Sequence, residues 1–122
     1  MIQQKINTVQ KIVNKANGKN NFTYKLKECD KRYIVSVKNI YLGFNPSLCY
    51  DLNLKLKDII NDNIFDSIGG WNDFGKGKNK PYYLDANVHF YNLDDAITIA
   101  KKYNQIAIFD KQKNKTIIIN KQ

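Results

Sequence analysis

The sequence predicts an α+β fold in which a small, mainly antiparallel sheet packs against an N-terminal amphipathic helix and a C-terminal helix. Three observations predict this fold. Apolar residues recur with helical spacing near the N-terminus, several later segments alternate with the period of a strand, and a helix-start pattern follows one of them. The length of 122 residues fits one domain, residues 1–122, and a hydrophobic content of 43% is enough for a compact core.

The first expected element is a helix over residues 2–17. Its apolar side chains fall on one face, and they are Ile2, Ile6, Val9, Ile12, Val13 and Ala16. Gly18 follows as a stop signal. Because the apolar stripe is narrow, we expect the helix to dock either on the sheet of its own chain or on another copy of the chain.

Two strands are expected next. Residues 22–29 alternate between apolar and polar side chains, which predicts a half-buried strand, and residues 33–38 alternate again after a short turn. We expect these two strands to pair as a hairpin. The apolar run 40–44 forms an added strand or a bulge, and a turn around Pro46 breaks the run.

Residues 48–68 carry two competing patterns. The first apolar residues alternate as in a strand, at Leu52, Leu54 and Leu56. The later ones have helical spacing, at Ile59, Ile60, Ile64, Phe65 and Ile68. We expect a short strand or turn, followed by a helix that ends at Gly69-Gly70.

The C-terminal part of the chain has clearer signals. Residues 81–90 predict a strand. Asn92 then acts as the N-cap of a helix over residues 93–103, whose acidic first turn suits the helix dipole. Two short strands, residues 106–110 and 116–120, complete the expected sheet.

The chain is strongly basic, with a formal charge of +9 from 20 Lys and Arg residues against 11 Asp and Glu. Arg32 is the only arginine in the sequence. Because Lys is a point charge on a flexible stem, whereas Arg recognises planar groups bidentately, this excess favours general attraction to anions over the reading of base edges. An AT-rich coding sequence, which the abundant Asn, Ile and Lys indicate, is the alternative origin of the charge.

The residue types that carry most enzyme chemistry are scarce. His89 is the only histidine, and Cys29 and Cys49 are the only cysteines, so no metal-ligand spacing and no nucleophile–base pair is visible. A histidine in an apolar strand is more simply a packed residue. We therefore expect a protein that is not an enzyme and that holds no metal or cofactor. The sequence has no signal-peptide pattern and no stretch approaching a membrane span, so we expect a cytoplasmic protein without membrane contact.

The segment from Gly69 to Asp110 carries the pattern that favours ligand binding. It places aromatic residues beside lysines, and the candidates are Trp71, Phe74, Tyr82, Tyr83, Lys76 and Lys78. A flat ring holds a base by stacking, and a lysine neutralises a phosphate, so this combination is typical of a nucleotide site. The alternative for the glycine- and lysine-rich part is a plain hairpin tip.

Two restrictions apply to these candidates. Because Tyr82 and Tyr83 are adjacent on an expected strand, they point to opposite faces, and only one of them can belong to the core. The amides of Asn92 and Gln105 can match a base edge, although helix capping alone is enough to explain Asn92.

The C-terminal half of the chain resembles a pattern found in small phage and prophage proteins. The residues that carry the resemblance are Gly70-Trp71, Tyr83-Leu84-Asp85, Phe90, Leu93-Asp94-Asp95-Ala96-Ile97, Ala100 and Asn104-Gln105-Ile106-Ala107-Ile108-Phe109-Asp110. Among such proteins, the chain is similar to the first-described family of Thoeris anti-defence proteins, best over residues 69–120.

This resemblance implies a sponge, which binds cyclic ADP-ribose isomers made by a TIR-domain defence enzyme and sequesters them without cleavage. It also implies cyclic oligonucleotides as further ligands and pockets between the protomers of a homo-oligomer, a dimer or higher. Tyr82 or Tyr83 would stack on adenine, and Asn92 would lie against the base or ribose. The phosphate contacts of that family rely on arginine, so Arg32 and the lysines would supply them here. The alternative is a small nucleic-acid-binding domain, which the +9 charge favours.

Overall fold

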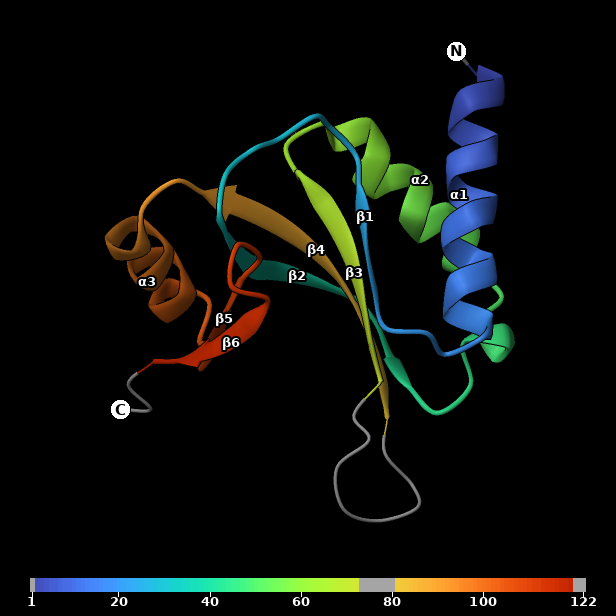
Figure 1. Cartoon of the computed structure of the whole chain (residues 1–122). Helices are drawn as coiled ribbons and strands as arrows, with labels where there is room; N and C mark the ends of the chain where they lie inside the picture. The colour runs from blue at the N-terminus through green and yellow to red at the C-terminus, as the bar shows by residue number, and fades with distance from the viewer. Residues whose placement is uncertain (1, 73–80, 120–122) are drawn as a thin grey trace.

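Six strands form one antiparallel, curled sheet in the part of the chain that the structure describes (Figure 1). The structure is a computed structural model, and it describes residues 2–72 and 81–119. The strands are β1 (Phe22–Lys25), β2 (Tyr33–Gly43), β3 (Ser67–Asn72), β4 (Tyr82–Phe90), β5 (Ala107–Asp110) and β6 (Lys115–Ile118). Their order across the sheet is β1-β3-β4-β2-β5-β6.

Three α-helices among the described residues pack against this sheet, which confirms the predicted α+β class. They are α1 (Ile2–Asn17), α2 (Leu52–Asp62) and α3 (Leu93–Lys102), and a short 3₁₀ helix, η1 (Pro46–Leu48), precedes α2. In Figure 1, α1 and α2 lie side by side at one side of the sheet, whereas α3 lies at the other side beside β5 and β6.

The buried apolar side chains form two clusters that follow this division. The first joins α1 and α2 to the sheet through Val9, Ile12, Ala16, Leu52, Leu56, Ile59, Ile68, Tyr82, Leu84 and Ala86. The second lies under α3 and contains Val35, Ala96, Ala100, Ile108 and Ile119. Because the described apolar face of α1 is buried in the first cluster, the helix docks on its own chain.

The two longest strands, β2 and β4, run antiparallel along the centre of the sheet. Their register extends from Tyr33 opposite Phe90 to Gly43 opposite Tyr82, and it is interrupted twice by an extra residue in β2. Such bulges increase the local twist of a strand pair. The apolar run at 40–44, predicted as an added strand or a bulge, continues β2 as far as Gly43. One of the two bulges lies at its start, between Asn39 and Tyr41.

The predicted hairpin between residues 22–29 and 33–38 is wrong. β1 pairs with β3, and β2 pairs with β4. Phe22 and Tyr24 of β1 pack in the first cluster, under α1 and α2, whereas the start of β2 lies under α3. The chain therefore crosses from one core to the other between these strands, and local alternation carries no information about that crossing.

The predicted helix end at Gly69-Gly70 is also wrong. α2 ends at Asp62, and Asn63 follows in the left-handed conformation with φ of 56°. Leu52, Leu56 and Ile59 share one buried helical face, so the helical spacing overrides the alternation of the leucines. Both glycines lie inside β3.

Gly70 occupies its place in β3 because no side chain fits there. A Cβ atom at this position would overlap with the ring of Phe22 and with the hydroxyl of Tyr82. That hydroxyl donates a hydrogen bond to the carbonyl oxygen of Asn20, at 2.7 Å. Burial raises the pKa of Tyr82 to about 12, so its hydroxyl keeps the proton it donates.

The helix predicted at 93–103 is observed with a capped start. Asn92 Oδ1 accepts a hydrogen bond from the Asp95 backbone N–H at 2.9 Å, and the helix ends at Lys102. Asn104 follows in the left-handed conformation, with φ of 58°. No helix within the described residues is long and apolar enough to cross a membrane.

Candidate functional site

Three large side chains from neighbouring strands meet on one face of the sheet. Trp71 of β3 and Leu42 of β2 are the direct cross-strand partners of Tyr83 of β4. Directly opposed residues on one face have Cβ atoms about 5 Å apart, so the three side chains adjoin. Trp71 is 51% exposed, Leu42 is 54% exposed and Tyr83 is half-buried. We call these three residues the platform, and the sheet face that carries them the open face.

The next row of the open face is polar, and its third position is a glycine. Asp85 lies between Gly69 of β3 and Asn39 of β2. Asn39 Nδ2 donates a hydrogen bond to Asp85 Oδ1 at 3.0 Å, which confirms that both side chains share this face. Burial raises the pKa of Asp85, while hydrogen bonds from Asn39 and Ser36 act in the opposite direction.

A buried polar cluster follows along the same face of β4. Asn87 Nδ2 donates to Ser67 Oγ at 3.1 Å, and the Ser67 hydroxyl forms a 2.7 Å hydrogen bond with His89 Nε2. His89 Nδ1 is buried without a hydrogen-bond partner. A serine beside a histidine is the start of a nucleophile–base pair. Here both residues are buried, with His89 only 1% exposed, so the pair packs inside the protein.

This cluster makes stability depend on pH. Burial lowers the pKa of His89 to about 4 from an ordinary value of 6.5. The unfolded chain therefore binds the proton first, and stability that is fully present above pH 6.5 is lost as the pH falls towards 4. We expect the free energy of unfolding to be about 2 kcal/mol lower at pH 5 than at pH 7. Urea titrations at the two pH values measure this difference, and a His89→Gln variant with the same pH dependence would contradict it.

The predicted site residues lie in different parts of the chain. Trp71 and Tyr83 come together on the platform, whereas Tyr82 is the core member of its pair. Phe74, Lys76 and Lys78 lie outside the described residues. Arg32 and Asn92 lie near the opposite end of β4, on the order of 25 Å from Tyr83 along the strand, and Gln105 lies between α3 and β5.

Asn92 and Gln105 form hydrogen bonds with residues of α3, at its start and just after its end. Besides capping α3 through its carbonyl oxygen, Asn92 donates from Nδ2 to Asp95 Oδ2 at 3.0 Å. Gln105 is half-buried, and its backbone N–H donates to the Ala100 carbonyl oxygen at 2.8 Å, just after α3. The capping interpretation of Asn92 is thus confirmed, and Asn92 lies beyond the end of β4 that is away from the platform.

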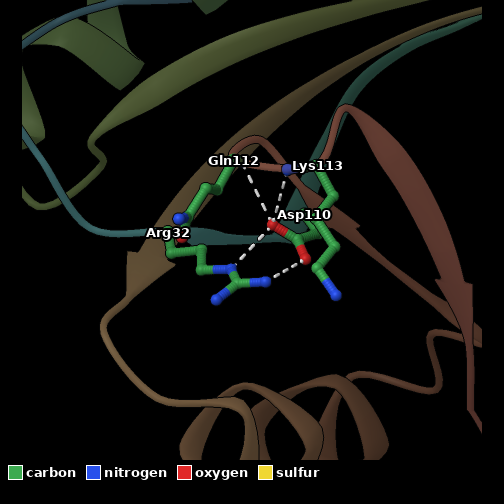
Figure 2. A network of polar contacts seen from close by, with 4 residues as sticks. All are labelled: Arg32, Asp110, Gln112 and Lys113. Carbon is green, nitrogen blue, oxygen red and sulfur yellow. Dashed lines mark hydrogen bonds and ion pairs between the residues drawn. The ribbon is translucent and has the colours of Figure 1, made fainter.

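Arg32 forms an ion pair with Asp110 that Figure 2 shows in detail. Arg32 Nε donates to Asp110 Oδ1 at 2.9 Å, and Nη2 donates to Oδ2 at 2.8 Å. The backbone N–H groups of Gln112 and Lys113 donate to Oδ1 as well. The hydrogen bonds from Arg32 hold the pKa of Asp110 at about 2. A phosphate at Arg32 would have to compete with this carboxylate.

Sequence reasoning missed four residues that build the open face. Leu42 belongs to the expected apolar run 40–44, and Gly69 belongs to the expected helix end. Asn39 lies between the expected strand 33–38 and that run, and Asp85 lies within the expected strand 81–90. The alternation of Tyr83, Asp85, Asn87 and His89 along one strand was the available signal. This alternation predicts which residues share one face of β4. It does not predict which residues of β2 and β3 lie beside them, because that depends on the order of the strands.

No protein-family model matches this sequence, no curated protein matches it, and no solved structure matches its fold.

Proposed function

We propose that the chain is a non-catalytic phage or prophage anti-defence protein, which binds a cyclic nucleotide immune signal and sequesters it in the host cytoplasm. The signal is a cyclic ADP-ribose isomer such as glycocyclic ADP-ribose, with cyclic oligonucleotides as further ligands. The observation that carries the proposal is the cross-strand pair of Trp71 and Tyr83 on the open face. Two adjacent, accessible aromatic rings offer a base a stacking surface worth about 1–3 kcal/mol for each base held.

Charge on the same face supports a phosphorylated ligand. Lys25 of β1 is the cross-strand partner of Ser67, whose side chain lies on the open face, so Lys25 lies on that face as well. It follows Thr23, the partner of Gly69, by two residues. Its ammonium group is 4.0 Å from the carboxylate of Glu28, at an exposed position where an ion pair contributes little. Lys25 is therefore available to a phosphate. The formal charge of +9 adds a general attraction for anions.

A homo-oligomer is part of the proposal, and exposed apolar residues support it. Leu42, Leu48 and Cys49 border a cleft of about 430 Å³ beside the β2 edge, and Phe44 and Tyr50 are exposed in the same part of the chain. Clusters of this kind are typical of surfaces that are covered by another protein chain.

The test is a depletion experiment. The purified protein is mixed with glycocyclic ADP-ribose, separated by size exclusion with light scattering, and then heat-denatured. We expect the ligand to elute with an oligomer and to be released with an unchanged mass. Recovery of a hydrolysed product, or no depletion of free ligand, would exclude sequestration.

The same experiment tests the platform directly. Trp71→Ala removes a ring that is half exposed, so the fold is retained while the stacking surface is lost. We expect the affinity for glycocyclic ADP-ribose to fall about tenfold or more. Tyr103→Ala is the matched control, because Tyr103 is 44% exposed at the end of α3 and belongs neither to the platform nor to the proposed oligomer surface. Equal affinities of the two variants would place the ligand elsewhere.

A second candidate function is binding of single-stranded nucleic acid, which the +9 charge and the same platform favour. Such binding weakens steeply with salt, because neutralised phosphates release their counterions. Gel-shift titrations with single-stranded DNA and RNA at low salt distinguish the two functions, and the absence of any complex removes this candidate.

A further inference from the structure

The acceptor chemistry beside the platform is suited to one kind of base. Asp85 follows Tyr83 by two residues on the same strand and face, so the two Cα atoms lie about 7 Å apart. A purine stacked on the platform rings spans this distance, with one edge directed at the Asp85 carboxylate. The purine whose edge donates more hydrogen bonds to the Asp85 carboxylate therefore binds better.

Gly69 contributes no side chain to the row beside Asp85. The atoms nearest to a Cβ added at Gly69 are Asn87 Nδ2, at 3.0 Å, and the Phe22 carbonyl oxygen, at 3.7 Å. Neither Trp71 nor Asp85, its neighbours along and across the strands, is among these nearest atoms. The position between the platform and Asp85 thus has a backbone floor, and the Asn87 amide borders it on the side away from the platform.

The carboxylate has a limited and countable hydrogen-bonding capacity. An ionised aspartate accepts about four hydrogen bonds and donates none. Asn39 donates one to Oδ1, and the Ser36 side chain donates another. The remaining acceptor positions match two N–H donors from a ligand.

Guanine presents two adjacent donors on its pairing edge, the N1–H and the exocyclic N2–H₂. Adenine presents a donor and an acceptor there, and its N1 lone pair faces a carboxylate unfavourably. We infer that the open face binds guanine-containing cyclic nucleotides in preference to adenine-containing ones, with Asp85 reading the base edge. This inference rests on the proposed function, because stacking on the platform brings the base to Asp85.

Cyclic di-GMP and cyclic di-AMP are matched probes, because they share a backbone and differ only in the base. We expect calorimetric titration of the wild-type chain to give at least about tenfold tighter binding of cyclic di-GMP, the discrimination typical of one bidentate pair. Equal affinities, or tighter binding of cyclic di-AMP, would overturn the inference and leave the sponge intact. If neither probe binds while glycocyclic ADP-ribose does, the inference also fails. If none of the three binds, the proposed function fails.

Asp85→Asn tests the role of the carboxylate. Asparagine keeps the shape of the side chain but offers one acceptor and one donor, which match the adenine edge. We expect the preference to shift towards cyclic di-AMP, while Asp62→Asn, a change at an exposed carboxylate on α2, leaves it unchanged. An unaltered preference in Asp85→Asn contradicts the assignment of Asp85. The wild-type comparison stands independently of how well either variant folds.

Discussion

Gly70→Ala is expected to destabilise the protein by about 3 kcal/mol, whereas Gly69→Ala changes the stability by less than about 1 kcal/mol. The two glycines are neighbours in β3 and face opposite sides of the sheet. A methyl group at Gly70 overlaps with Phe22 and with the Tyr82 hydroxyl, so a buried ring must move and its hydrogen bond to Asn20 is strained. At Gly69 the added methyl meets the amide nitrogen of Asn87, at 3.0 Å, a contact that a small shift of this side chain relieves.

Chemical denaturation of the two variants under one set of conditions measures this difference. Because both changes are glycine to alanine in the same strand, backbone entropy and strand propensity largely cancel between them. Similar stabilities for the two variants would mean that Tyr82 does not pack against β3 as the structure places it.

Asp110→Ala is expected to have the second large effect, a fall in melting temperature on the order of 10 °C. The Asp110 side chain is only 2% exposed, and it accepts hydrogen bonds from Arg32 and from two backbone N–H groups of the β5–β6 turn (Figure 2). Its loss leaves the Arg32 guanidinium without its carboxylate and the turn without its anchor. Asp62→Ala, which removes an exposed carboxylate, is the matched control.

The pH dependence of the same pair provides an independent check. The pKa of Asp110 is lowered to about 2 from 3.8, so the stability it contributes is present above pH 3.8 and is lost as the pH falls towards 2. This window lies below the His89 window, so the two contributions separate in a pH series. In Asp110→Ala the acidic loss should disappear while the His89 loss remains.

Local pattern was enough to predict most elements of the fold, and it failed where distant contacts decide. The helical stripe of α1, the alternation of β4 and the Asn92 cap are all signals within a few residues, and each is observed. The glycines of β3 were interpreted as a helix end because glycine commonly ends helices. Gly70 lies in a strand because Tyr82, far along the chain, occupies the space of a side chain.

The candidate site was predicted in part for the same reason. Trp71 and Tyr83 were recognised as aromatic candidates by residue type, and their partnership follows from the pairing of β3 with β4. Leu42, Asn39 and Asp85 meet them only because β2 lies on the other side of β4. Arg32 was assigned to phosphate as the only arginine, and its partner Asp110 becomes a neighbour only through the pairing of β2 with β5.

The intrinsic fluorescence of Trp71 gives the most direct test of the central claim, because Trp71 is the only tryptophan of the chain and belongs to the platform. A base stacked on the indole quenches its emission. Titration of the wild-type protein with glycocyclic ADP-ribose and with cyclic di-GMP should therefore give saturable quenching, and mass spectrometry should recover both ligands intact. Emission that stays constant while calorimetry registers binding would place the ligand away from the open face and contradict this account.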